Sequence, residues 1–280
     1  MINGLAIWHY PHRTLLENIN FFAEQGFKSV SALGTHFYSA CQDNKTSCKM
    51  ASLVKEKNIL LTVHAKMPST HSEDDVKEFE NFIDCIADWQ KKYGLLAVLS
   101  FDVPQHIRDN VMPYIEYVLK YEEFKKVAVE DFGLTKEEKE QIEHLKENKR
   151  FGFLVDIGHM YIRMRGKNTR GVTIFENQES ECKQTDNPGY DDFLRAIETK
   201  GFPIFEIHLH NNDGIDDLHY FFDDGTLDIG MISDVLKDLK YEEILTIESA
   251  PGFKFECRYP ESDERILKTF EYWKNVSSLG

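Results

Sequence analysis

Short strand-type segments alternate with helical segments along almost all of this 280-residue chain, and this alternation constrains the fold more than any other feature. Within the strand-type segments, apolar residues either alternate with polar ones or run nearly without interruption, as in strands that are covered on both faces. We expect eight strands, at Gly4–His9, Phe27–Leu33, Asn58–His64, Leu95–Asp102, Val127–Glu130, Phe151–Asp156, Phe205–His210 and Glu243–Glu248.

The segments between these strands carry apolar residues at helical spacing. The clearest helix begins after Ser72, a suitable N-cap that is followed by acidic residues, and Gly94 ends it. Pro113 predicts a kink or a late start in a later helix. The expected helices cover Leu15–Ala23, Lys45–Lys57, Ser72–Tyr93, Ile107–Lys120, Thr135–Lys146, Asp191–Lys200, Leu227–Leu239 and Glu261–Asn275, and a polar loop is expected before the second of them.

Eight strand and helix units divide 280 residues into 35 residues each, which suits an α/β fold of the closed parallel (β/α)8 TIM barrel type. The alternative is an open doubly wound sheet. Such a sheet normally carries a glycine-rich phosphate loop after its first strand, and the sequence HYPHRT at that place contains no glycine. We therefore expect a single domain over residues 1–280, with a lid-like insertion at about 163–188, where the alternation breaks down.

Charge and cysteine content narrow the classes of function. The net charge of −15 repels polyanions and disfavours a nucleic acid as partner, unless basic residues are concentrated locally. The five cysteines are scattered without a CxxC pair, which argues against a disulfide framework or a thiolate zinc site. No segment has the apolar length of a membrane span, and the N-terminal segment lacks the pattern of a signal peptide, so we expect a cytoplasmic protein.

Potential metal ligands stand at the carboxyl ends of six of the predicted strands: His64, Asp102, Glu130, Asp156, His210 and Glu248. A polar residue at one strand end is ordinary, because each strand must leave the core. In a barrel, however, all these ends meet on the face that carries active sites. Six such residues therefore predict a shared metal site.

A second set of candidate ligands lies close to the first in sequence. His159 follows Asp156 by three residues, and Asp217 and His219 follow the polar turn NNDG after His210. Imidazole nitrogens and carboxylate oxygens suit borderline divalent metals, so these residues predict space for two or three ions. The other interpretation of the turn is a solvated acidic loop.

Taken together, the sequences VEDF, VDIGH, HLHNNDG, DLH and TIE resemble the xylose isomerase-like barrel superfamily, which includes sugar and sugar phosphate isomerases and epimerases and the AP endonucleases of the endonuclease IV type. The resemblance covers most of the barrel from about residue 60 onward. It implies a central divalent ion held by Glu130, Asp156, His210 and Glu248.

In the epimerase branch, the resemblance implies that Glu130 and Glu248 also move the proton beside the substrate carbonyl, and that His159 contacts the substrate. In the endonuclease branch, it implies that His64, His159, Asp217 and His219 complete a three-metal cluster. The sequence departs from that pattern at Asp102, where the endonucleases carry histidine, and at Asp223-Asp224-Gly225, where a GEG turn is usual.

Several further residues have a functional and a structural interpretation. Lys66 could hold a carbonyl oxygen or a phosphate, or be an exposed loop lysine. Trp8, His9 and Phe37 could wall the pocket or pack in the core. His208 is expected to be packed or solvated and not a metal ligand, because it lies deeper in its strand than His210. The basic cluster Arg163, Arg165, Lys167 and Arg170 could clamp a phosphate or form a solvated loop.

Three functions are compatible with these residues. The first is a metal-dependent isomerase or epimerase of a sugar, sugar phosphate or related polyol, with a small-molecule partner. The second is a metal-dependent phosphodiesterase of the AP endonuclease type, against which the net charge weighs. The third is a non-catalytic barrel with a binding or regulatory role. Manganese suits the carboxylate-rich ligand set, and zinc is favoured if the histidines His64, His159 and His219 also bind. The sequence allows a homo-oligomer.

Overall fold

The computed structural model describes residues 1–65, 67–68, 70–102, 111–130, 140–166, 185–250 and 259–278. Eight parallel strands form a closed barrel in the order β1 to β8, which confirms the predicted TIM barrel. Pairing of β1 with β8 closes the ring, with Ile2 beside Ile244 in register. The strands are β1 (Ile2–Ala6), β2 (Ser29–Leu33), β3 (Leu60–Ala65), β4 (Leu96–Phe101), β5 (Val127–Glu130), β6 (Phe151–Asp156), β7 (Ile204–Leu209) and β8 (Ile244–Ile247).

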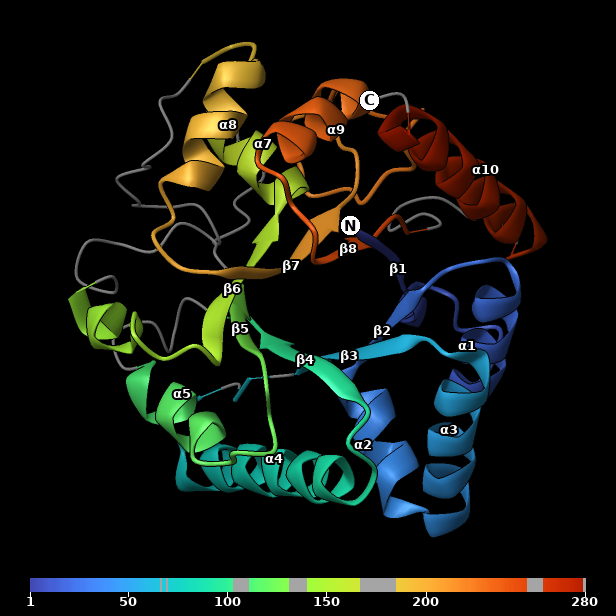
Figure 1. Cartoon of the computed structure of the whole chain (residues 1–280), viewed down its shortest axis with the longest axis vertical. Helices are drawn as coiled ribbons and strands as arrows, with labels where there is room; N and C mark the ends of the chain where they lie inside the picture. Colours follow the sequence, from blue (N-terminus) through green and yellow to red (C-terminus); the bar gives the residue numbers. More distant parts are fainter. Residues whose placement is uncertain are drawn as a thin grey trace.

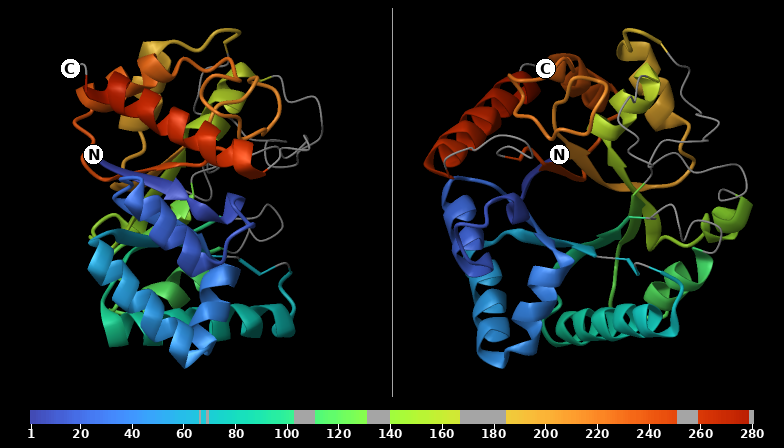
Figure 2. Two further views of the ribbon diagram at one scale, coloured as in Figure 1. Left: turned by 90° about the vertical axis from the view of Figure 1, so that its right-hand side faces the viewer. Right: turned by 180° about the vertical axis from the view of Figure 1, so that it is seen from behind.

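Helices surround this ring, as Figure 1 shows along the shortest axis of the molecule and Figure 2 from the side and from behind. Their starts follow from local sequence. In α4, the Ser72 hydroxyl accepts a hydrogen bond from Asp75 N, and Gly94 ends the helix with a φ of 65°. The helices are η1 (Ile7–His9), α1 (Leu15–Glu24), α2 (Gly34–Gln42), α3 (Asn44–Lys57), α4 (Glu73–Tyr93), α5 (Met112–Leu119), η3 (Glu143–Leu145), α7 (Ile157–Arg165), α8 (Tyr190–Glu198), α9 (Ile229–Asp238) and α10 (Tyr259–Ser278).

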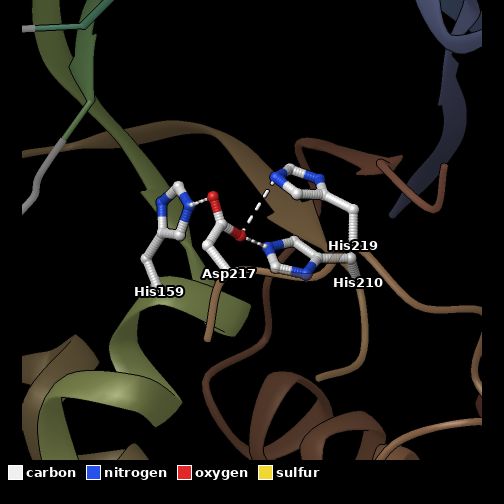
Figure 3. A group of neighbouring side chains, drawn as sticks. All are labelled: His159, His210, Asp217 and His219. Carbon is white, nitrogen blue, oxygen red and sulfur yellow. Dashed lines mark ion pairs between the residues drawn. The ribbon is translucent and has the colours of Figure 1, made fainter. Parts of the chain in front are cut away.

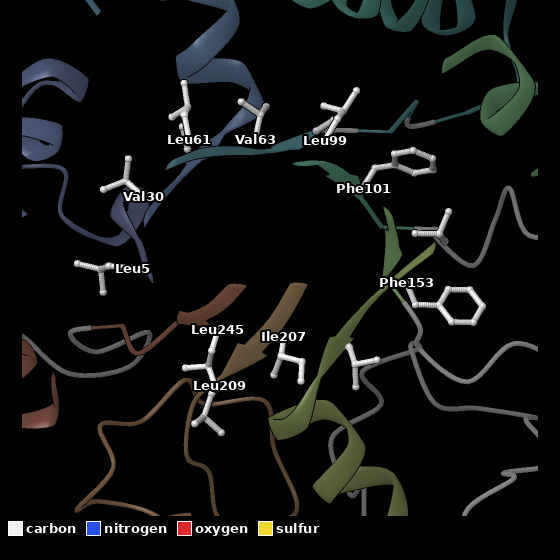
Figure 4. Packing of buried hydrophobic residues seen from close by; sticks show 14 of the residues in the cluster. Leu5, Val30, Leu61, Val63, Leu99, Phe101, Phe153, Ile207, Leu209 and Leu245 are labelled. Atoms are coloured by element: carbon white, nitrogen blue, oxygen red, sulfur yellow. The ribbon is translucent and has the colours of Figure 1, made fainter. Parts of the chain in front are cut away.

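The main apolar core lies between the strands and the helices, not inside the barrel. Figure 4 shows side chains such as Leu61, Val63 and Leu99 pointing from the strands toward the surrounding helices. Because side chains alternate across a strand, the residues between them face the barrel interior. Among these, Val98 and Leu154 belong to a separate, smaller apolar cluster. The interior also holds polar residues, which are described below.

Two sequence predictions are wrong, the limits of the first strand and the polar loop after β2, and one on Pro113 agrees with the structure. The strand predicted at Gly4–His9 begins and ends earlier, because β1 pairs with β8 from Ile2 onward and Ile7–His9 forms the 3-10 helix η1. The predicted polar loop after β2 is largely helix α2. This helix approaches β3 and α4 through Gly34, where a Cβ atom would lie 2.5 Å from Phe82 Cζ and 2.9 Å from Ala65 Cα. Pro113 lies in the first turn of α5, which accords with a late start.

The first residues of the lid-like insertion predicted at about 163–188 are helical, and the insertion itself stays a prediction. Arg163 and Arg165 belong to α7, which continues directly from β6 and ends at Gly166 with a φ of 58°. Residues 167–184 lie outside the described part of the chain, as do residues 107–110 and 135–139 of two predicted helices.

Cys41, Cys48 and Cys85 are free thiols.

Candidate metal centre

The predicted ligands at the strand ends are brought together at the carboxyl face of the barrel. His64, Glu130 and Asp156 lie at the ends of β3, β5 and β6, and Asp102, His210 and Glu248 directly follow β4, β7 and β8. Their side chains are buried, except that Asp102 is partly exposed. Burial of this many ionisable groups is costly unless they are paired or bind a cation.

Asp156 is the common neighbour of the other predicted central ligands. Its Oδ1 accepts a hydrogen bond of 2.7 Å from His159 N, which makes it the N-cap of α7, and lies 3.2 Å from His210 Nε2. Its carboxylate also lies within 4.8 Å of ligand atoms of Glu130 and of Glu248. Asp156 Oδ2 is buried and has no hydrogen-bond partner among the described residues. Three residues that end or follow three other strands thus meet at the Asp156 carboxylate.

Four side chains form a second group, shown in Figure 3 with Asp217 between the imidazoles. Asp217 Oδ2 lies 3.2 Å from His159 Nε2, and Asp217 Oδ1 lies 3.1 Å from His219 Nε2 and 3.8 Å from His210 Nε2. The rings of His210 and His219 stack with centroids 4.0 Å apart.

The hydrogen bonds of two of these rings favour a cation in the second group. His219 Nδ1 donates to Glu248 O at 3.0 Å, and His210 Nδ1 donates to Asn211 O at 3.3 Å, since a carbonyl oxygen can only accept. In a neutral imidazole the opposite nitrogen, Nε2, then carries a lone pair. Both Nε2 atoms face the Asp217 carboxylate, an arrangement that is favourable only with a proton or a metal ion between them.

The third group joins His64, Asp102 and Glu130. His64 Nε2 lies 2.9 Å from Asp102 Oδ1 and 3.7 Å from Glu130 Oε2, while His64 Nδ1 contacts Ser100 Oγ at 3.1 Å. Glu130 Oε1 contacts His159 Nδ1 at 3.0 Å, which links this group to the other two. Asp102, at which the sequence departs from the endonuclease pattern, is therefore placed where it can still supply a ligand.

The charges of these groups shift their pKa values in opposite directions. Burial and the charge of Asp102 raise the pKa of Glu130 to about 8. Burial acts in the same sense on Glu248, but the charges of His208 and His219 outweigh it and hold its pKa well below the usual range. Burial lowers the pKa of His219, yet the Asp217 charge dominates and raises it to about 10. Protons on Glu130 and on the neighbouring imidazoles thus offset the buried negative charge. A bound metal ion could take the place of these protons.

One part of the site differs from the sequence prediction, the buried residues on the inner face of β7. His208 is 1% exposed, and its Nδ1 lies 2.8 Å from Glu248 Oε2, so it is neither solvated nor packed only against apolar groups. Below it, Glu206 is fully buried and was not singled out from the sequence. The alternation of Glu206, His208 and His210 along one strand was the available signal, because all three must share a face.

The aromatic candidates separate into two classes. Trp8 stacks on His64 with ring centroids 5.9 Å apart, and His9 Nε2 lies 3.8 Å from Glu248 Oε1, so both lie beside the ligand groups. Phe37 instead is fully buried and packs edge-on against Trp89 at 5.0 Å. It belongs to the core.

The loop after β7 holds Asp217 and His219 in place through one buried side chain. Asn211 Nδ2 donates to Phe222 O at 2.9 Å and to Leu227 O at 3.1 Å, while its Oδ1 accepts from Asn212 N and Leu227 N. A Cβ atom at Gly225 would lie 2.0 Å from Asn211 Oδ1, so this turn requires glycine. The preceding Asp223 and Asp224 both pair with Arg265 of α10, at 2.8 and 2.7 Å.

The described part of the basic cluster lies on α7. Arg163 is 7% exposed, and Arg165 Nη1 donates to Tyr161 Oη at 3.1 Å. A Cβ atom at Gly214 would lie 2.4 Å from Arg165 Cδ, so Arg165 also packs on the loop after β7. Lys66, Lys167 and Arg170 lie outside the described residues. Phosphate binding by these side chains stays a prediction.

The donor set fits a divalent metal of the borderline class. It consists of imidazole nitrogens and carboxylate oxygens, which suit manganese or zinc. Three of its buried atoms, Asp156 Oδ2, His210 Nε2 and Asp217 Oδ1, have no hydrogen-bond partner among the described residues. Such atoms are expected where a cation completes the site.

A sequence-family model described as a xylose isomerase-like TIM barrel matches residues 19–275. A curated relative, an uncharacterized protein of Methanocaldococcus jannaschii, is 26% identical over 117 residues, which span 42% of this chain and only 32% of that protein. No helix in the described ranges has the length and apolar character needed to cross a membrane.

Solved structures show the same barrel over nearly the full chain. A D-tagatose 3-epimerase-like protein, 18% identical, gives a TM-score of 0.65 and covers 98% of this chain and 99% of its own. D-psicose 3-epimerase of Clostridium cellulolyticum H10, solved with D-tagatose, is 11% identical with a TM-score of 0.67 and covers 99% of each chain. A 3-keto-D-glucoside 4-epimerase of E. coli is 13% identical with a TM-score of 0.65, and covers 98% of this chain and 99% of its own.

Proposed function

The chain belongs to the xylose isomerase-like TIM barrel family, and from that premise we propose that it is a divalent-metal-dependent epimerase or isomerase of a sugar, sugar phosphate or related polyol. The observation that carries the proposal is the position of Asp156, whose carboxylate lies beside Glu130, His210 and Glu248 at once. In this proposal these four residues hold the central metal ion.

The order of the strands gives the two glutamates distinct positions. Glu130 ends β5 and Glu248 follows β8, so they stand on the two sides of β6 and β7, which carry Asp156 and His210. A bound divalent ion would polarise a substrate carbonyl and its neighbouring hydroxyl. One glutamate would then remove the proton from the adjacent carbon and the other would return it, and a return to the opposite face inverts the centre.

Two further residues fit a role in substrate binding. His159 is held by Glu130 on one side and Asp217 on the other, so its ring is fixed where it could contact a substrate hydroxyl. Trp8 offers an apolar ring face beside His64, as aromatic walls under sugar rings do. The solved epimerases with the same fold support a sugar as the substrate class.

The second candidate is a phosphodiesterase of the AP endonuclease type, which the groups around Asp217 and His64 favour. With the central group they could hold three ions, enough to activate water and stabilise a leaving oxygen. The net charge of −15 opposes this function, because duplex binding needs many phosphate contacts. We therefore place it second.

A parallel assay separates the two functions. Metal-loaded protein is incubated in D2O with a panel of ketoses, each with and without phosphate, and separately with a duplex containing one abasic site. The proposed function predicts deuterium at the carbon next to the carbonyl of at least one sugar and an intact duplex. Duplex cleavage without deuterium in any sugar would establish the second function and refute the first. Preference for a phosphorylated sugar would implicate Arg163 and Arg165.

A further inference from the structure

A buried pair of ionisable residues, Glu206 and His208, lies on the inner face of β7 below the metal centre, and the proposed reaction does not use it. Glu206 is fully buried. Its Oε1 accepts hydrogen bonds from Thr62 Oγ1 of β3 at 3.1 Å and from Thr246 Oγ1 of β8 at 2.6 Å. The carboxylate is thus fixed from both sides of the barrel interior.

His208 connects this carboxylate to the metal centre. Its Nε2 lies 3.5 Å from Glu206 Oε1, and its Nδ1 lies 2.8 Å from Glu248 Oε2. Both contacts are ion pairs, because neither ring nitrogen has the alignment of a hydrogen bond. In the sheet, His208 pairs with Asp156 of β6 and with Thr246 of β8. The rings of Trp8 and His64 pack beside it, with centroids 6.2 and 5.6 Å away.

The two oxygens of Glu248 therefore have different surroundings. Oε2 lies 2.8 Å from His208 Nδ1, whereas Oε1 lies 3.8 Å from His9 Nε2 and 3.9 Å from His219 Nδ1. Glu248 forms with His9 and His219 a group that could hold a metal ion. Apolar residues of similar volume generally stabilise a buried site as well as an ion pair does, so stability alone does not explain Glu206 and His208. Metal-binding carboxylates are usually held by a second residue in this manner.

We propose that His208, supported by Glu206, is a positioning residue that holds Glu248 Oε2 and so presents Oε1 to the metal ion and the substrate. This inference rests on the proposed function, because it takes Glu248 as a metal ligand. It assigns no ligand role to His208 itself. Loss of such support typically weakens metal binding by about 10–100-fold.

Two substitutions at one position test the proposal. His208→Leu removes the contact with Glu248, and we expect the dissociation constant for Mn2+ to rise by about 10–100-fold. His208→Asn places an amide nitrogen the same number of bonds from Cα as Nδ1, so we expect its affinity to stay within a few-fold of the parent protein. Glu206→Leu, which is remote from the ligands, should weaken binding in the same sense as His208→Leu.

Val98→Ala is the matched control, because Val98 also faces the barrel interior but belongs to its apolar cluster. It should lower the unfolding temperature and leave Mn2+ affinity unchanged. Binding is followed by the electron paramagnetic resonance signal of free Mn2+, which gives affinity and stoichiometry without a substrate. The outcome is therefore readable even if no sugar exchanges deuterium, a result that would refute only the proposed function.

Two results would overturn the positioning role. If His208→Leu binds Mn2+ as tightly as Val98→Ala, Glu248 needs no support. If His208→Leu loses one equivalent of Mn2+ and the remaining ions keep their affinity, His208 is itself a ligand. Failure of the asparagine variant to restore the affinity that the leucine variant loses would likewise contradict the proposal.

Discussion

The Gly158→Ala substitution tests the position of His210 directly, because the added methyl group would collide with the His210 ring. Gly158 is the second residue of α7, and a Cβ atom there would lie 2.2 Å from His210 Cε1 and 2.3 Å from His210 Nε2. Ordinary contacts of a Cβ atom begin at 3.4 Å. The Gly158→Ala substitution must therefore displace the ring by about 1.2 Å or shift the helix by as much.

The displacement is large compared with what a metal site tolerates, since metal–ligand distances vary by about 0.2 Å. Loss of a residue that supports a ligand lowers metal affinity by about 10–100-fold, which equals roughly 1.4–2.8 kcal/mol. Loss of a ligand itself should lower the affinity by at least as much. The stacked ring of His219 would be disturbed as well. Overpacking should lower the unfolding free energy by roughly 1–3 kcal/mol, against a gain of roughly 0.5–1 kcal/mol from replacing a helical glycine.

The chain contains a matched control in the same sequence context. Asp228-Ile229-Gly230 starts α9 as Asp156-Ile157-Gly158 starts α7, and in both helices the aspartate caps a backbone N–H three residues later. At Gly230 the nearest atom to an added Cβ is Asp228 Oδ1 at 3.3 Å. Gly230→Ala should therefore keep full metal affinity. Calorimetric titration with Mn2+ compares the two, and equal affinities would show that His210 is not where the metal binds.

Three further predictions concern the candidate ligands Glu130 and Glu248 and the loop after β7. The Glu130→Gln/Glu248→Gln double variant should lose metal by elemental analysis, and an unchanged metal content would contradict the ligand assignment. The pKa of Glu130 is raised to about 8, so a metal ion must displace its proton below that pH. Mn2+ affinity should therefore rise by about tenfold per pH unit from pH 6 to 8, with release of a proton. A flat pH profile in calorimetry would show that Glu130 does not bind the metal. Asn211→Ala removes four buried hydrogen bonds and should lower the unfolding free energy in urea by roughly 2–4 kcal/mol, whereas the exposed Asn187→Ala should not, and similar values for both would mean that the loop does not depend on Asn211.

The barrel could be predicted from the sequence because most of its strands have a local apolar pattern and end in a polar residue. Val127–Glu130 and Phe151–Asp156 agree with the structure to the residue. β1 was misplaced, since its limits depend on pairing with β8, which lies more than 200 residues away in the chain. Long-range pairing of this kind leaves no local trace.

The site shows the same limit. Residues at strand ends could be grouped, because topology brings those ends together whatever the details of packing. Helix α7 is not among the helices predicted from the sequence, and neither are the contacts of Arg165 with Tyr161 and Gly214. The polar character of Glu206 and His208 was visible in the sequence, but only the register with Asp156 and Thr246 places them beneath Glu248.

The division between the outside and the inside of the barrel has a consequence for how such proteins diverge. The apolar core lies between strands and helices, as Figure 4 shows, while the interior holds the candidate metal ligands and polar residues such as Thr62 and Glu206. Selection for folding and selection for chemistry therefore act on alternate residues of the same strands. Inward positions can acquire a new reaction while their outward neighbours keep the architecture, which accounts for one barrel shared at 11–18% identity.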